Sequence, residues 1–139
     1  MKNFAIGHPL NEPVVTIKKE VDTQTRKSLS KFGSFVRQTS RRSIRRGKGS
    51  SKPGKPPFSH TGLLKQFIYF GYDPHRASVV IGPVVISGKS GKALQALESG
   101  GMVRLPDGRN VEIKPRPFMG PAFEKEQEKL NSLWASSLK

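Results

Sequence analysis

The side chains that could do chemistry in this 139-residue chain are few and scattered. His8, His60 and His75 lie far apart, and none has a nearby acidic companion that would suggest a metal site. Ser59 and His60 could form a nucleophile and its base, but adjacent residues rarely point at each other and no acid orients the histidine. The chain has no cysteine, which excludes disulfides and thiolate ligands. We therefore predict that the protein is not an enzyme and has no catalytic, metal or cofactor site.

Residues 82–90, GPVVISGKS, superficially resemble a phosphate-binding loop. That loop needs four residues between its first glycine and the Gly-Lys pair, and here five separate Gly82 from Gly88. Val84 to Ile86 moreover favours a strand, not a loop. The spacing therefore argues against nucleotide binding.

The densest chemical group is basic and lies at residues 41–46, RRSIRR. On a helix, Arg41 and Arg45 would share a face, and so would Arg42 and Arg46. Few aromatic residues interleave with these cations, so contact with a phosphate backbone fits better than base stacking. An acidic protein partner is the other interpretation. The predicted contact residues are Arg37, Arg41, Arg42, Arg45, Arg46, Lys48, Lys52 and Lys55.

The net charge of +15 is uneven along the chain. Residues 1–58 hold 14 Lys and Arg against 3 Asp and Glu, residues 59–116 hold 8 against 4, and residues 117–139 hold 3 of each. A basic block of this kind attracts phosphate backbones or other anionic surfaces. No apolar run approaches the roughly 18–20 residues that would span a bilayer. The first residues also lack the apolar core of a signal peptide, so we expect synthesis in the cytoplasm and no membrane partner.

The first half of the chain predicts an arm, a helix and a linker. Residues 1–13 read as an extended N-terminal arm, with Pro9 and Pro13 as breakers. Residues 14–46 carry a narrow apolar stripe at helical spacing and predict a long basic helix. Residues 47–59 have the composition of a linker, stiffened by prolines. The stripe consists of Ile17, Val21, Thr25, Leu29, Phe32, Val36, Ser40 and Ile44.

The second half predicts a sheet and a terminal helix. Residues 63–72 and 78–86 read as two strands of an antiparallel hairpin, with a bulge or edge at Pro83. A short helix at 92–99 would stop at Gly100, and Pro-Asp-Gly at 106–108 predicts a second hairpin. Residues 60–116 would thus form an antiparallel sheet of about four strands. The sequence predicts one α+β domain over residues 14–139, in which this sheet packs with the long helix and a C-terminal helix at 117–139.

The C-terminal helix has an amphipathic pattern. Pro121 suits its first turn, and Phe123, Gln127, Leu130, Trp134 and Leu138 recur at helical intervals. We expect these and other large apolar residues to pack in the core or against another subunit. The residues predicted for such packing are Phe67, Tyr69, Phe118, Met119, Phe123 and Trp134.

Several stretches together resemble a known family. They are RKSLSKFGSFVRQTSRRSIR at 26–45, PGKPPFSHTGLL at 53–64, ALESGG at 96–101 and RPFMGPAFEK at 116–125. The chain from about residue 20 to 138 resembles tailed-phage neck proteins. These are the tail-completion or head–tail joining proteins, also called virion morphogenesis proteins.

The resemblance implies an α+β virion structural protein without enzyme activity. It implies a homo-oligomeric ring of six copies around the DNA channel at the head–tail interface. Adjacent neck, head-closure, tail-tube or terminator proteins would be its partners, with sequence-independent contact to packaged DNA. The alternative that the composition leaves open is a stand-alone basic nucleic-acid-binding protein of ribosomal or nucleoid-associated type.

Overall fold

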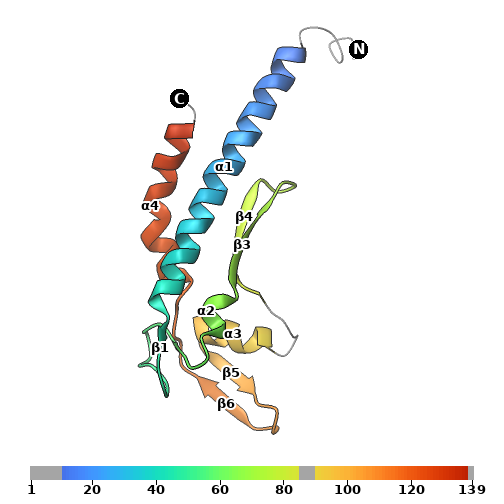
Figure 1. The fold of residues 1–139 in the computed structure, drawn as a ribbon. Coiled ribbons are helices and arrows are strands. Elements are labelled where there is room, and N and C mark those ends of the chain that lie inside the picture. Colours follow the sequence, from blue (N-terminus) through green and yellow to red (C-terminus); the bar gives the residue numbers. More distant parts are fainter. Residues whose placement is uncertain (1–10, 85–89, 138–139) are drawn as a thin grey trace.

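The computed structural model describes residues 11–84 and 90–137. The elements bear out the predicted α+β class, and Figure 1 shows them as an elongated arrangement around one long helix. They are α1 (Asn11–Ser43), β1 (Arg45–Arg46), β2 (Phe58–Ser59), α2 (Leu63–Gln66), β3 (Ile68–Asp73), β4 (Ser78–Pro83), α3 (Ser90–Ser99), β5 (Gly101–Arg104), β6 (Asn110–Ile113) and α4 (Gly120–Ser137).

The expected four-stranded sheet is wrong, because the described strands form three separate two-stranded sheets. β1 pairs with β2 in parallel, whereas β3–β4 and β5–β6 are antiparallel hairpins. The residues of β5 and β6 are mostly exposed, so this hairpin is not buried against β3–β4. Each hairpin pairs only its own two strands, so no backbone ladder joins them into one sheet.

Helix α1 differs from the expected helix at both ends. Asn11 to Pro13 belong to α1 and not to an extended arm, since a proline in the first helical turn lacks only an N–H that would have no partner there. The remainder of the expected arm, residues 1–10, lies outside the described residues. At the other end α1 stops at Ser43, and Ile44 leaves the helix to become fully buried. Arg45 and Arg46 therefore lie on a strand.

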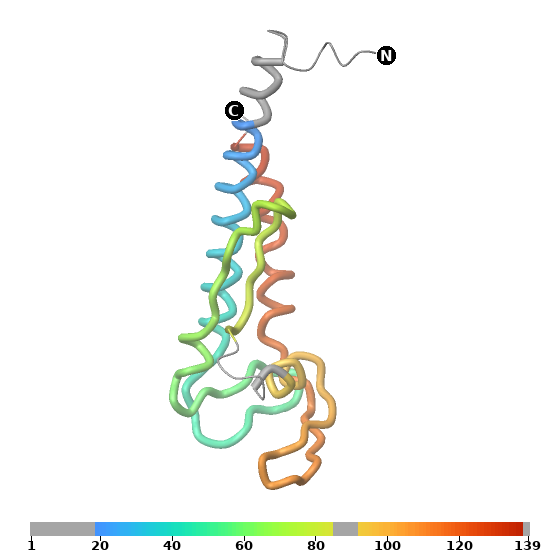
Figure 2. Tube along the Cα trace, turned by 90° about the vertical axis from the view of Figure 1, so that its right-hand side faces the viewer, coloured from blue at the N-terminus to red at the C-terminus, as the bar shows by residue number. Residues whose placement is uncertain are grey.

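Two elements cover α1 on different sides. Helix α4 runs antiparallel beside it, and the β3–β4 hairpin lies along another side (Figures 1 and 2). Phe32 and Val36 of the predicted stripe are buried with Ala122 of α4, while Val79 and Ile81 of the hairpin pack against them. The stripe prediction is thus confirmed in this central part of α1, whereas Val21 is 44% exposed.

Gly33 lets the hairpin approach α1 closely. A Cβ built on Gly33 would lie 2.8 Å from Cγ2 of Val79 and 3.0 Å from the ring of Phe70. Glycine lowers helix stability by about 1 kcal/mol relative to alanine. At Gly33 this penalty accompanies close packing of α1 on the hairpin, which a larger side chain would force apart.

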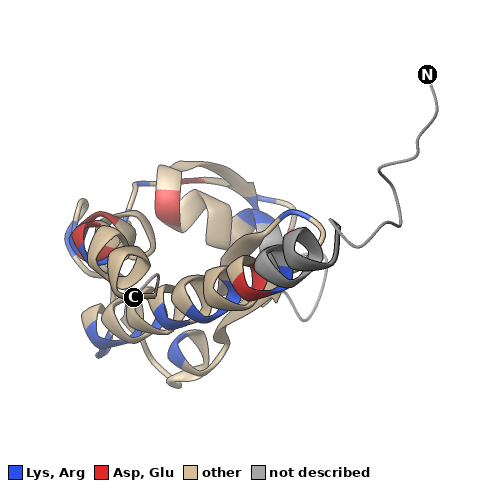
Figure 3. Cartoon of the chain, turned by 90° about the horizontal axis from the view of Figure 1, so that it is seen from above, with Lys and Arg blue, Asp and Glu red and all other residues tan. Residues whose placement is uncertain are grey.

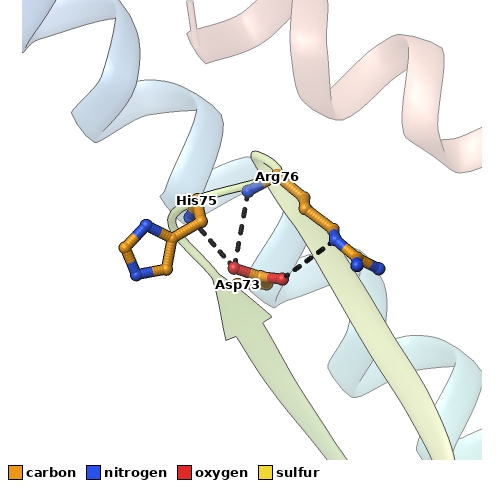
Figure 4. A network of polar contacts seen from close by, with 3 residues as sticks. All are labelled: Asp73, His75 and Arg76. Carbon is orange, nitrogen blue, oxygen red and sulfur yellow. Dashed lines mark hydrogen bonds and ion pairs between the residues drawn. The ribbon is translucent and has the colours of Figure 1, made fainter.

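The β3–β4 hairpin begins later than predicted. Leu63 to Gln66 form one helical turn, α2, which follows Gly62 at φ 82°. β3 then runs from Ile68 to Asp73, and Ile68 pairs with Pro83 at the end of β4. Residues 85–86 of the predicted second strand lie outside the described residues. Asp73 orders the tip of the hairpin, because its Oδ1 accepts hydrogen bonds from the backbone N–H groups of His75 and Arg76 (Figure 4).

A second cluster joins three distant segments. Ile44 after α1, Ile68 at the start of β3 and Phe118 before α4 are each at most 1% exposed and pack together. Leu64, Leu97 and Met119 surround them. This cluster fixes where the long helix, the hairpin and the terminal helix meet.

Glu98 of α3 holds the start of α4. Its Oε2 accepts hydrogen bonds from the N–H groups of Phe118 (3.0 Å) and Met119 (3.1 Å), and its Oε1 accepts from Gly120 (2.7 Å). These groups have no helical partner, and a carboxylate there also complements the helix dipole. The short helix α3 and its stop at Gly100, φ 78°, agree with the sequence prediction.

The predicted hairpin at Pro-Asp-Gly is also present. Gly108 has φ 88°, and Leu105 donates its N–H to the carbonyl of Arg109. The side chain and the backbone N–H of Arg109 both donate hydrogen bonds to Asp107. These bonds, the side-chain bond most, lower the pKa of the Asp107 carboxyl below its usual value.

The buried face of α4 is shifted from the predicted one. Ala122 and Glu126 are buried, while Phe123 is 44% and Trp134 is 38% exposed. Small Ala122 allows close approach to α1, whereas the ring of Phe123 meets Phe32 edge-on, with centroids 5.8 Å apart. Leu130 still contacts the core, and Leu138 lies outside the described residues.

Glu126 is a buried carboxylate in the contact between α1 and α4. Its Oε1 accepts a hydrogen bond from Thr39 (2.6 Å), and its Oε2 pairs with the ammonium group of Lys129. The same ammonium lies 5.0 Å from the ring centroid of Phe35. Lys129 foremost, and Thr39 next, lower the pKa of Glu126 against the opposing effect of burial.

We expect Glu126 to make stability depend on acid pH. A lowered folded-state pKa stabilises the fold above the ordinary value of 4.5, and this contribution disappears as pH falls through the folded-state pKa. Urea unfolding of the wild type and Glu126→Gln should show a difference near neutral pH that narrows below about pH 4.5. Glu124→Gln, at an exposed position, is the control. A difference that is constant with pH would contradict this role.

Replacing Glu98 should weaken the attachment of α4. Glu98→Gln removes the charge and one of two acceptor atoms, so we expect a loss of about 1–2 kcal/mol in the free energy of unfolding. Chemical denaturation monitored by circular dichroism would measure it. Glu112→Gln, which removes an exposed carboxylate on β6, should change stability by less than about 0.5 kcal/mol. Equal effects of the two variants would refute the capping role.

Candidate functional site

The predicted basic residues gather where α1 ends. Figure 3 shows Lys and Arg recurring along α1, with fewer acidic positions on the chain. Arg37 and Arg41 are half-buried, and the other six predicted contact residues are exposed. The shared helical faces of Arg41 with Arg45 and of Arg42 with Arg46 are not formed, because the helix has ended at Ser43. The structure instead arranges most of these cations around two hollows.

The first hollow, here named the side hollow, lies beside the last turns of α1. Arg37 and Arg41 are one helical turn apart, and Arg42 continues the same wall. Lys65 of α2 faces them from outside the helix. The described lining of the side hollow is Ser34, Phe35, Arg37, Gln38, Arg41, Arg42 and Lys65.

The second hollow, named the loop hollow, lies between the end of α1 and the segment before β2. Arg42 belongs to both hollows, so they adjoin. Arg46 and Lys48 are exposed but are not among the described residues of either lining. The described lining of the loop hollow is Arg42, Ser43, Arg45, Ser51, Lys52, Lys55, Pro56 and Phe58.

Hydrogen bonds hold the predicted linker against the rest of the fold. The N–H of Gly54 donates to the carbonyl of Pro115 (2.8 Å), and Nε of Arg116 donates to the carbonyl of Ser51 (2.9 Å). Farther along, His60 bonds the carbonyl of Gly49 at 3.0 Å. Lys52 and Lys55 are thereby carried on an ordered loop.

Arg37 is positioned by the hairpin. Its Nε donates to the carbonyl of Ile68 at 2.7 Å, and its guanidinium carbon lies 5.5 Å from the ring centroid of Tyr69. Both contacts fix the side chain across the start of β3 while leaving further N–H groups of the guanidinium toward the side hollow. Arg37 therefore combines a structural contact with a place in the basic wall.

The charges of the two hollows are not neutralised within the part of the chain that the structure describes. Ion pairs there join Arg76 to Asp73, Arg109 to Asp107 and Lys129 to Glu126, and none includes a lining residue. Neither described lining contains Asp or Glu. The surface thus carries a field that attracts anions.

The Ser59 and His60 side chains contact different partners. Ser59 is buried and its Oγ accepts the N–H of Gly62 at 3.0 Å, just before α2. His60 is engaged with Gly49, as described above. Among the described residues, no three His, Cys, Asp or Glu side chains form a group that could hold a metal.

The predicted packing residues divide into two sets. Phe118 lies in the core, Met119 packs against both clusters, and Phe67 is half-buried. Tyr69 is 48% exposed and lies outside the core, as do Phe123 and Trp134. For the exposed set, subunit contact is the interpretation that still stands.

Comparison with protein-family models, with curated proteins and with solved structures finds no match. Separately, none of the helices in residues 11–84 and 90–137 is long and apolar enough to cross a bilayer. The candidate site therefore has to be interpreted from its own geometry.

We expect the two kinds of arginine to differ in stability. Arg37→Gln should lower the free energy of unfolding by about 1–2 kcal/mol, because it removes a charged hydrogen bond and a cation–π contact. Arg41→Gln, in the same wall but without such contacts to residues 11–84 and 90–137, should change it by less than about 0.5 kcal/mol. Thermal unfolding of both variants would test this. If Arg41→Gln were as destabilising as Arg37→Gln, the distinction would be wrong.

Proposed function

We propose that this protein is a structural subunit of a tailed-phage neck, of the tail-completion or head–tail connector type. It would act by associating with further copies and with adjacent neck proteins around the DNA channel. The observation that carries the proposal is an exposed, mainly apolar patch on the outer face of the β3–β4 hairpin. The resemblance of the sequence to neck proteins indicates which assembly this face would serve.

The outer face of the hairpin carries Tyr69, Gly71, Val80 and Gly82 along most of its length, and Asp73 and Ser78 at its tip. Phe70 and Val79 point toward Gly33 of α1, so their strand neighbours point away from it. Gly71 pairs with Val80, and Tyr69 pairs with Gly82. Val80 is 67% exposed, a large fraction for an apolar residue in a regular strand.

No contact or backbone angle in the described chain requires glycine at the two glycine positions of this face. A Cβ built on Gly71 or Gly82 meets nothing within 4 Å, and neither has a positive φ. Glycine weakens a strand, and in that setting it often marks the close approach of another backbone. A mainly apolar surface also lets copies of a strongly basic chain meet without bringing many like charges together.

A further apolar hollow supports association. Leu29 of α1 and Leu130, Asn131, Trp134 and Ala135 of α4 line it. The exposed indole of Trp134 gives this hollow a large apolar ring of the kind that is enriched in subunit contacts.

The stretches that carry the resemblance are adjacent in the fold. Gly54 of PGKPPFSHTGLL donates its N–H to Pro115, which directly precedes RPFMGPAFEK, and Arg116 of RPFMGPAFEK donates to Ser51, two residues before PGKPPFSHTGLL. Phe118 of the second stretch and Leu64 of the first contribute to the same cluster. The two stretches therefore belong to one structural unit of the fold.

A stand-alone nucleic-acid-binding protein is the second candidate, and the two basic hollows favour it. The uncovered hairpin face and the Trp134 hollow are not needed for that function. For this reason the assembly role is the better account of the whole surface.

The assembly role predicts a defect that electron microscopy can detect. Phage with a stop codon in this gene should yield DNA-filled heads and separate, unjoined or misfinished tails. The wild-type gene supplied in trans should restore joined particles, whereas Val80→Asp should not, because a buried carboxylate would stand in the subunit contact. Joined, normal particles from the stop-codon phage would overturn the proposal.

A matched control is Met102→Asp. Met102 on β5 is 67% exposed, as Val80 is, but lies on the other hairpin. It should restore joining. If both variants failed equally, the assignment of the contact to the β3–β4 hairpin would be wrong.

A further inference from the structure

We infer that the side hollow and the loop hollow together bind the sugar–phosphate backbone of duplex DNA without reading its sequence. This inference goes beyond the assembly role, since it concerns what the purified chain binds. It selects one partner where the sequence leaves nucleic acid and acidic protein open.

The first argument is the density of positive charge. Seven cationic residues line the two adjoining hollows, and Arg42 belongs to both. Duplex DNA carries one negative charge per about 1.7 Å of its axis, so several of these cations can each meet a phosphate. An acidic peptide offers at most one carboxylate per residue, about 3.3 Å apart when extended. The denser polyanion therefore matches this surface better.

The second argument is the scarcity of stacking groups. Single strands bind on successive aromatic rings. Phe35 in the side hollow already has the ammonium of Lys129 over its ring, and Phe58 is the other aromatic residue in the described linings. One free ring does not make a platform for several bases, which favours the phosphates of an intact duplex.

The third argument is preorganisation. Arg37 is fixed by its contacts with Ile68 and Tyr69. The loop that carries Lys52 and Lys55 is held to the segment before α4 by the hydrogen bonds of Ser51 and Gly54. Groups that are already ordered lose little conformational freedom on binding. Arg41, Arg42 and Arg45 remain available, with planar guanidinium groups that suit phosphate oxygens.

Fluorescence anisotropy of the purified full chain with a labelled, mixed-sequence duplex of about 25 base pairs would test the inference. The site variant replaces four lining cations outside the structural contacts of Arg37. Its substitutions are Arg41→Gln, Arg42→Gln, Arg45→Gln and Lys65→Gln. We expect its Kd to rise at least about tenfold at about 0.1 M salt, and the slope of log affinity against log salt to become shallower by about 2–4.

The control variant has the same net charge but retains both hollows. It replaces four exposed cations elsewhere, namely Lys19→Gln, Lys27→Gln, Lys92→Gln and Arg104→Gln. Its Kd should stay within about threefold of the wild-type value, and its slope of log affinity against log salt should change by less than about 1. Circular dichroism of both variants would verify that they are folded.

Three outcomes would overturn the inference. The first is absence of wild-type binding at about 0.05 M salt. The second is an equal loss of affinity in the site and control variants, which would assign binding to net charge alone. The third is displacement of the duplex by poly-glutamate as effectively as by unlabelled duplex at equal charge, which would assign the surface to an acidic protein. Because none of these readouts uses phage particles, each leaves the assembly role to be judged separately.

Discussion

The shared burial of Ile44, Ile68 and Phe118 determines how the rest of the molecule is arranged. Ile44 enters this cluster directly after α1 ends at Ser43, and the two arginines that follow it form a strand. Ile68 starts the hairpin at the same place, and Phe118 brings α4 back along α1. Three segments far apart in sequence thus fix one another, and Glu98 secures the last of them through three backbone N–H groups.

Much of the local structure could be predicted from the sequence, because it depends on local signals. Helical spacing indicates α1, and Gly100 and Pro-Asp-Gly indicate the end of α3 and the second hairpin. The end of α1 could not be predicted, since Ile44 fits the helical stripe and leaves it only for partners at positions 68 and 118. The phase of α4 was missed for a similar reason. Ala122 and Glu126 look like surface residues until Thr39 and Phe32 are placed opposite them.

The candidate site was predicted in composition but not in shape. Basic residues near the end of α1 are evident from RRSIRR, yet their faces depend on where the helix stops. Lys65 was missed because it lies on a turn that reads as a strand in the sequence. The structural role that distinguishes Arg37 from the other arginines was also missed, because no sequence pattern indicates its hydrogen bond to the carbonyl of Ile68.

The pairing of α1 with α4 has a consequence for the order of folding during synthesis. The ribosome completes α1 long before it makes residues 118–137, and these supply Ala122, Leu130 and Leu133 to the core around Phe32 and Val36. Until then, the nascent chain has the hairpin alone to cover the apolar stripe of α1. Contacts so distant in sequence form slowly. This part of the chain therefore cannot finish folding before α4 has been made, and chains that still lack α4 are the most exposed to aggregation and to capture by chaperones.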